Sequence, residues 1–140
     1  MPPEHAPRIL LVDDHELVRK GLASLLSTRW LVCGEAGNGE EAIEKILELR
    51  PDLVLLDLSM PVMGGTATAR YIRRIVPGIK LVLLSIHDSA TVAELAKAVG
   101  ADAFLSKSCT VAALHSVITA LIGPATGDDP PLPFRVASAD

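Results

Sequence analysis

Residues 53–57 read Leu-Val-Leu-Leu-Asp, an apolar run without polar alternation that ends in one carboxylate. Two further stretches have the same form: Arg8–Val12 contains ILLV, and Lys80–Ser85 contains LVLL. Continuous apolar character is typical of strands that are covered on both faces, as in a parallel sheet. The sequence therefore predicts three central strands in these ranges.

Two weaker runs, Trp30–Ala36 and Asp102–Leu105, fit edge or near-edge strands. Between the five runs, apolar residues recur with helical spacing. The repeating positions are Val18, Leu22, Leu25 and Leu26; Ile43, Ile46 and Leu47; Ile72, Ile75 and Val76; Val92, Leu95, Ala96 and Val99; and Leu114, Val117, Ile118 and Leu121. Five alternations of strand and helix predict a mostly parallel sheet with helices on both faces.

The chain has 140 residues, 49% of them hydrophobic and 21% charged, which is the composition of one globular domain. Its net charge is −4 and its basic residues are scattered, so nucleic-acid binding by this chain alone is disfavoured. The densest basic group, Arg70, Arg73 and Arg74, is interpreted as a solvated helix face.

No apolar run approaches the roughly 20 residues of a membrane helix, and we expect a cytoplasmic protein. Residues 8–122 form the expected domain, and the proline-bearing residues 123–140 are interpreted as a linker or disordered tail.

The chemistry-bearing side chains follow the ends of the predicted strands. Asp13 and Asp14 follow the first strand, Asp57 and Ser85 end the third and fourth, and Lys107 follows the fifth. Ligands of open α/β sheets bind at the carboxyl ends of the strands, so we expect these five side chains to converge. Two carboxylates about 4 Å apart repel by about 4 kcal/mol at an effective dielectric near 20, which favours a bound cation. Oxygen ligands without a Cys or His set favour Mg²⁺.

Simpler interpretations exist for each residue taken alone. Asp57 could be an ordinary loop or helix-cap residue. Paired acids such as Asp13 and Asp14 are favoured at a helix N-terminus. Ser85 fits a strand-end hydroxyl that bonds local backbone groups. Their shared position at one sheet edge is what favours a functional site over these simpler interpretations. In such a site, a carboxylate could attack a phosphoryl donor and form an acyl phosphate.

Four segments carry a family resemblance: LLVDDHELVRKGL (residues 10–22), LVLLDLSMPVMGG (53–65), LVLLSIHDS (81–89) and GADAFLSKS (100–108). Together they resemble the receiver domain of bacterial two-component response regulators, in particular the NarL/FixJ branch, whose members usually carry a LuxR-type helix-turn-helix. The resemblance covers residues 8–122. It implies a flavodoxin-like (βα)5 doubly wound sheet with strand order 2-1-3-4-5.

The resemblance also implies roles. Asp57 would accept the phosphoryl group and Lys107 would pair with it. Asp13 and Asp14 would hold Mg²⁺, together with Asp57 and the backbone carbonyl of Ser59. The protein would be a signalling domain rather than an enzyme, although it would assist its own phosphorylation and dephosphorylation.

Ser85 and Phe104 would form the switch pair, with the ring moving inward, and Ser59 and His87 would tune the lifetime of the phosphorylated state. The implied partners are a sensor histidine kinase, a second copy of the chain, and DNA only through a C-terminal domain beyond these residues; no membrane is involved. The sequence departs from the commonest receiver pattern at three positions: Ile86 is bulky, Ser108 replaces a proline, and Phe104 replaces a tyrosine.

Other functions remain as alternatives. A stand-alone receiver would act through protein contacts without DNA. An aspartyl-phosphate phosphohydrolase would need an acid two residues after Asp57, where Ser59 stands. A dinucleotide-binding module would need a glycine-rich turn after the first strand, where Asp13 and Asp14 stand.

Overall fold

The computed structural model describes residues 7–58, 64–86, 90–123 and 135–137. Its elements are β1 (Arg8–Val12), α1 (Glu16–Leu26), β2 (Leu31–Ala36), α2 (Gly39–Leu49), β3 (Leu53–Asp57), α3 (Gly65–Ile75), β4 (Lys80–Ser85), α4 (Ala90–Ala98), β5 (Ala103–Ser106), α5 (Val111–Ile122) and β6 (Arg135–Ala137). The predicted alternation of strands and helices is confirmed. The three central strands have the predicted bounds, and β2 and β5 each begin one residue later than expected.

The sheet has the order β2-β1-β3-β4-β5-β6, and every pair is parallel. Its first five strands confirm the predicted order 2-1-3-4-5. The sixth strand was not foreseen: it lies in the stretch that sequence analysis assigned to a linker or tail, and pairs with Ala103–Leu105 of β5. Three residues in a proline-bearing stretch give no periodic signal of their own, so this strand depends on the edge that β5 offers.

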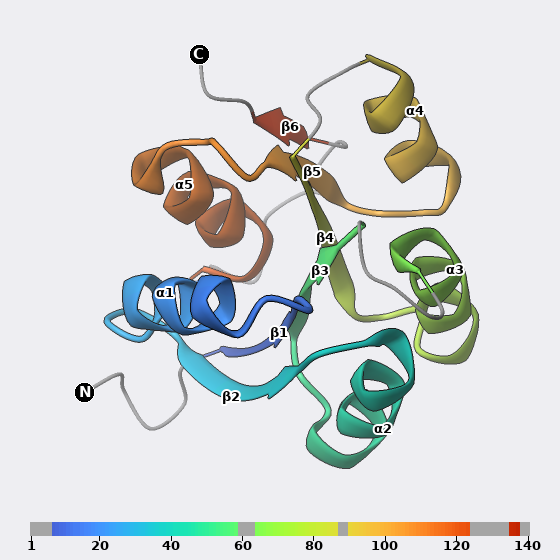
Figure 1. The fold of residues 1–140 in the computed structure, drawn as a ribbon, viewed down its shortest axis with the longest axis horizontal. Helices are drawn as coiled ribbons and strands as arrows, with labels where there is room; N and C mark the ends of the chain where they lie inside the picture. The colour runs from blue at the N-terminus through green and yellow to red at the C-terminus, as the bar shows by residue number, and fades with distance from the viewer. Residues whose placement is uncertain (1–6, 59–63, 87–89, 124–134, 138–140) are drawn as a thin grey trace.

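Figure 1 shows α1 and α5 on one face of the sheet and α2, α3 and α4 on the other. The side chains of β3 alternate between two buried clusters, with Leu53 and Leu55 facing α1 and α5, and Val54 and Leu56 facing the opposite layer. Because both faces are covered, the central strands need apolar residues at every position. This packing holds the carboxyl ends of the strands in one fixed row.

The helix boundaries follow local chemistry. Asn38 caps α2, since its side-chain oxygen accepts a hydrogen bond from the Glu41 N–H at 2.9 Å. Arg50 ends the same helix with a left-handed backbone (φ 48°), and Gly100 follows α4 with φ 85°. Asp52 and Asp102 lie at the amino ends of their strands, where each accepts a backbone N–H at 2.7 to 2.8 Å. They lie away from the row of strand carboxyl ends.

The interpretation of the basic group on α3 as a solvated face is wrong for one member. Arg73 donates to the carbonyls of Pro77 and Ile79 at 2.8 and 2.9 Å and lies 3.0 Å from Asp102 Oδ2. It therefore ties α3 to the starts of β4 and β5, whereas Arg70 and Arg74 are exposed.

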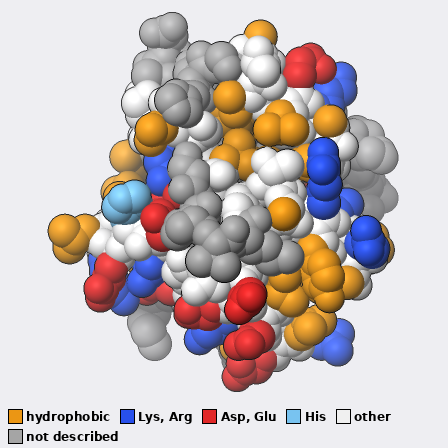
Figure 2. All heavy atoms as spheres, turned by 45° about the vertical axis from the view of Figure 1, so that its right-hand side comes forward, with side chains coloured by type: hydrophobic (Ala, Val, Ile, Leu, Met, Phe, Trp, Pro, Cys, Tyr) orange, Lys and Arg blue, Asp and Glu red, His pale blue; other side chains and the backbone are white. Residues whose placement is uncertain are grey.

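On the face shown in Figure 2, lysine and arginine are dispersed among acidic and apolar side chains and do not gather in one basic patch. Within the described residues, no helix has the length and apolar content needed to cross a membrane.

Candidate functional site

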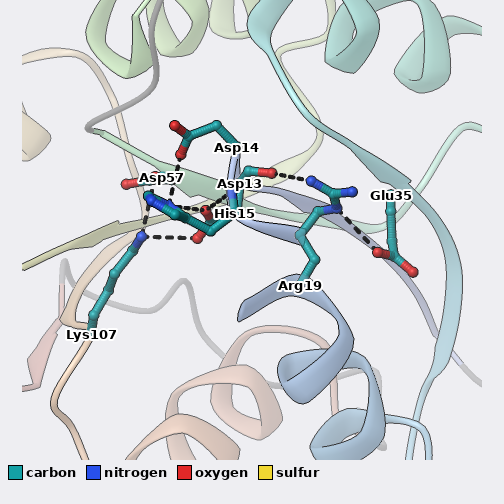
Figure 3. Close-up of polar contacts among 7 residues, drawn as sticks. All are labelled: Asp13, Asp14, His15, Arg19, Glu35, Asp57 and Lys107. Carbon is teal, nitrogen blue, oxygen red and sulfur yellow. Dashed lines mark hydrogen bonds and ion pairs between the residues drawn. The ribbon is translucent and has the colours of Figure 1, made fainter. Parts of the chain in front are cut away.

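Three strand ends converge as the sequence predicts. Asp13 follows β1, Asp57 ends β3, and Lys107 follows β5. The Lys107 ammonium lies 2.9 Å from Asp13 Oδ2 and 3.1 Å from Asp57 Oδ2 (Figure 3). Asp13 and Asp57 are 1% and 0% exposed, so the two carboxylates and the ammonium form a buried ion-pair cluster.

The backbone fixes the lysine in this position. The Lys107 N–H donates to the Ser85 carbonyl at 2.8 Å, which continues the pairing of β4 with β5 past the last strand residue. The lysine side chain is only 16% exposed. Its ammonium therefore approaches Asp57 across the intervening strand β4, from a backbone that the sheet itself holds.

Asp14 and His15 extend the cluster toward solvent. His15 Nδ1 lies 3.1 Å from Asp14 Oδ1 and 3.4 Å from Asp13 Oδ1, and its ring is 67% exposed. One ligand atom from each of Asp13, Asp14, His15 and Asp57 can be chosen so that all four lie within 4.8 Å of one another. His15 directly follows Asp13 and Asp14, but it has no second histidine or cysteine at metal-ligand spacing, so the sequence does not predict it as a ligand.

The donor set fits a divalent cation. Three carboxylates carry three negative charges against one Lys107 ammonium, and two of them are buried, where uncompensated charge is costly. Carboxylate oxygens are hard ligands that suit Mg²⁺. The residues present could thus hold the magnesium ion that the sequence predicts.

The charges in the cluster shift each other's protonation. Burial raises the pKa of Asp13, but the hydrogen bond from the His15 N–H and the contact with Lys107 outweigh it, and the pKa lies below its usual 3.8. Burial lowers the pKa of Lys107, but its contacts with Asp13 and Asp57 outweigh burial and place the pKa above 10.5. Both residues are therefore charged at neutral pH.

Gly64 and Gly65 bring the start of α3 against the backbone of Asp57. Gly64 has a φ of 73°, a conformation that glycine adopts without strain. A Cβ at Gly65 would overlap the Leu58 Cα and the Asp57 carbonyl oxygen. These two glycines belong to the segment that carried the family resemblance, and here they permit the close approach of α3 to β3.

The expected switch residues lie next to the cluster. Ser85 ends β4, is 2% exposed, and pairs in register with Ser106 of β5. Phe104 is 0% exposed and packs in the cluster on the side of α2, α3 and α4, opposite Leu83 of β4. The inward position that the resemblance implies for its ring after phosphorylation is therefore already occupied in this structure. Ser59 and His87 lie outside the described residues.

Sequence reasoning missed one residue that contacts the site. Arg19 of α1 donates from Nη1 to the carbonyl oxygen of Asp13 at 2.6 Å. Arg19 lies in the segment 10–22 that carries the family resemblance, but residue type does not reveal its contact, because its partner is a backbone atom that every residue has.

Comparison with known proteins agrees with this geometry. The response regulator receiver domain family matches residues 9–119. The chain belongs to that family. The receiver is 37% identical over 113 residues to response regulator protein VraR of Staphylococcus saprophyticus, covering 79% of this chain and 54% of VraR. It is 44% identical over 103 residues to transcriptional regulatory protein LnrK of Bacillus subtilis, covering 71% of this chain and 46% of LnrK.

Among solved structures, the receiver is similar to a two-component response regulator of the LuxR family from Aurantimonas sp. SI85-9A1. The TM-score is 0.80 at 34% identity, and the match covers 84% of this chain and 85% of that one. The receiver spans about half the length of the curated relatives it matches. Its relatives are thus response regulators of the LuxR/NarL type, as the sequence motifs indicate.

Proposed function

We propose that this receiver accepts a phosphoryl group on Asp57 from a sensor histidine kinase. The observation that carries the proposal is the Lys107 ammonium, which lies 3.1 Å from Asp57 Oδ2 and 2.9 Å from Asp13 Oδ2. A buried carboxylate held beside one fixed ammonium and two further acids is the arrangement that an acyl-phosphate site needs.

In the proposed reaction, an oxygen of Asp57 attacks the phosphorus of a phosphohistidine. The new P–O bond forms as the P–N bond breaks, and the imidazole leaves with the bonding electrons. Mg²⁺, held by Asp13, Asp14, Asp57 and the Ser59 carbonyl, would neutralise negative charge on the transferring oxygens. Lys107, which follows β5, supplies a second positive charge that stabilises the phosphorylated product after transfer.

Phosphorylation then acts on the neighbouring strand ends. The phosphoryl group adds a charge of about −1.5 to −2 and strong acceptor oxygens. The Ser85 hydroxyl, at the end of β4, moves toward these oxygens. The packing of the Phe104 ring, on the adjacent strand β5, changes with it. Their juxtaposition supports this coupling, since Leu83 and Phe104 are register partners two residues before Ser85 and Ser106. The proposed tuning residues are Ser59 and His87.

We further propose that residues 8–122 are the receiver of a cytoplasmic transcription regulator, joined through residues 123–140 to a DNA-binding output domain. The support is that the matched segment covers only about half of the curated relatives, which include a transcriptional regulatory protein. A second copy of the receiver is the proposed partner on phosphorylation. The alternative is a receiver that acts through protein contacts alone, and the reading frame beyond Asp140 discriminates between the two.

The test is intact mass after incubation with acetyl phosphate and Mg²⁺. We expect a gain of one phosphoryl group that requires Mg²⁺ and disappears in Asp57→Asn. No gain from acetyl phosphate or from a phosphorylated histidine kinase would contradict the proposal. Steady multiple turnover of phosphate esters would instead favour the phosphohydrolase alternative.

A further inference from the structure

Arg19 connects three elements at the edge of the acidic cluster. From α1, its Nη1 donates to the Asp13 carbonyl at 2.6 Å, and its Nε donates to Glu35 Oε1 of β2 at 3.1 Å. Figure 3 shows the guanidinium between the two partners, on the far side of Asp13 from Lys107. The Arg19 side chain is 16% exposed and that of Glu35 is 22% exposed, so water screens the contacts only in part.

Asp13 is held by neighbours on all its polar groups. Its N–H donates to the Ala36 carbonyl of β2 at 3.0 Å, and its carbonyl accepts from Arg19. Its Oδ1 accepts from the His15 N–H at 2.9 Å, and its Oδ2 faces the Lys107 ammonium. Among these four contacts, only the one to the Asp13 carbonyl is made by a side chain of helix α1, that of Arg19.

Glu35, which accepts a hydrogen bond from Arg19, is adjacent in sequence to Ala36, whose carbonyl accepts the Asp13 N–H. Glu35 precedes Ala36 in β2, and β2 pairs with β1 up to Val12 and Ala36. The peptide groups on both sides of Asp13 are therefore held by the same strand, β2. The Asp13 N–H bonds Ala36 directly, and the Asp13 carbonyl is linked to Glu35 through the Arg19 guanidinium. A planar guanidinium can make both contacts at once from two different nitrogens.

We propose that Arg19 is a positioning residue for the metal site: by fixing the Asp13 carbonyl, it holds the turn after β1 so that the Asp13 and Asp14 carboxylates are placed to bind Mg²⁺. This inference rests on the proposed function, because it assumes that these carboxylates hold the ion. Arg19 contacts neither the ion nor the phosphoryl group in this scheme. It acts through Asp13.

The charge of Arg19 makes the proposal easy to test by sign. A guanidinium near a cation site repels the cation, so removal of its charge alone would tighten Mg²⁺ binding. Loss of positioning has the opposite effect, because side chains that orient metal ligands commonly change metal affinity by about 10- to 100-fold. The two roles therefore predict changes of opposite direction in the dissociation constant.

The experiment is a MgCl₂ titration followed by amide chemical shifts, on the wild-type chain, Arg19→Ala and Lys20→Ala. Lys20 is the matched control, since it lies next in α1 and pairs with Glu35 Oε2 at 3.0 Å but does not contact Asp13. We expect the dissociation constant for Mg²⁺ to rise about tenfold in Arg19→Ala. Lys20→Ala should stay within about twofold of wild type, as exposed ion pairs contribute little.

A second readout reports the contact itself. Without metal, the carbonyl ¹³C shift of Asp13 should change in Arg19→Ala and not in Lys20→Ala, because only the first variant loses the hydrogen bond. Arg19→Lys, which can keep one of the two contacts, should recover part of the lost affinity. If Arg19→Ala does not fold, Arg19→Gln takes its place with the same expected weakening.

Unchanged or tighter Mg²⁺ binding in the folded Arg19 variants would overturn the positioning role while the proposed function stands. An equal loss in Lys20→Ala would also overturn it, since the effect would then come from the charge balance around Glu35. Absence of Mg²⁺ binding by the wild-type chain would overturn the metal site of the proposed function, and the positioning role with it.

Discussion

The Lys107 ammonium lies 3.1 Å from the Asp57 carboxylate, although Asp57 ends β3 and Lys107 follows β5, and these two strands are not neighbours in the sheet. Strand β4 runs between them, and the lysine reaches across its end. The same ammonium contacts Asp13 on the other side of Asp57, so one cation serves two buried acids.

This sharing predicts the effect of Lys107→Ala on stability without magnesium. Removing the ammonium leaves two buried carboxylates without that counter-ion, and breaking such a pair costs about 3 kcal/mol. We expect that loss in the free energy of unfolding in urea, and partial recovery when Mg²⁺ is added, because a ligand of the folded state stabilises it. Lys97→Ala, at an exposed position of α4, should have little effect; an equal loss there would contradict the explanation.

Glu35 predicts a pH dependence of stability. Burial raises its pKa, but the ion pairs with Lys20 and Arg19 outweigh burial, so that the pKa lies below its usual 4.5. A carboxylate with a lowered folded pKa contributes stability above its unfolded pKa and loses it as pH falls through the folded value. Glu35→Gln should therefore reduce stability at pH 7 by about 1 kcal/mol and converge toward wild type below pH 4.5. Urea unfolding at several pH values measures this, and parallel curves would argue against it.

Two helical glycines should respond to alanine in opposite directions. Gly65→Ala forces a Cβ against the backbone of Leu58 and Asp57, and overpacking of this kind costs about 1 to 3 kcal/mol. Gly21→Ala, within α1 and with no atom outside the adjoining helix backbone within 4 Å of the added Cβ, should stabilise by about 0.5 to 1 kcal/mol. Thermal unfolding of both variants tests the difference in sign. Equal shifts would show that the close approach of α3 to β3 can relax.

Arg73 should contribute more to the free energy of unfolding than Arg74, the next residue on α3. Arg73→Ala removes two hydrogen bonds to carbonyls and the contact with Asp102, for an expected loss of about 2 kcal/mol. Arg74→Ala, at an exposed position, should change the free energy of unfolding by less than about 0.5 kcal/mol. Similar losses in the two variants would restore the interpretation of the group as a uniform solvated face.

Ser85 should couple the phosphorylated site to α4. In Ser85→Ala, we expect the amide shifts of α4 that accompany phosphorylation to be largely lost, because the hydroxyl no longer reaches the phosphoryl oxygens. Ser106→Ala is the control, since Ser106 is the buried register partner of Ser85 and its hydroxyl contacts Ser108 instead. Intact α4 shifts in phosphorylated Ser85→Ala would exclude this coupling.

The sequence predicts most of the sheet because its strongest signals are local. The runs ending at Val12, Asp57 and Ser85 have apolar interiors without polar alternation, and they predict the bounds of β1, β3 and β4. Trp30 was assigned to a strand, but its N–H bonds the Leu26 carbonyl at the end of α1, which sequence alone does not reveal. Strand β6 escaped because its pairing with β5 is not local.

The site shows the same division. Asp13, Asp57 and Lys107 were predicted to converge because parallel strands align their carboxyl ends, a property of the fold class. The contacts of Arg19 and Arg73 were not predicted, because both bind backbone carbonyls that leave no mark in the sequence. Residue type identifies a charged side chain, and only the packed chain identifies the peptide group that it binds.

Strand β6 changes which backbone groups the sheet offers to other molecules. An unpaired edge strand is a template for strand addition by another chain. With β6 paired along Ala103–Leu105, the strand that leads to Lys107 and carries Phe104 is no longer such an edge. Among the described strands, a foreign strand could then extend the sheet only at β2 or along the three residues of β6, so a partner that recognises β5 itself does so through the side chains of β5.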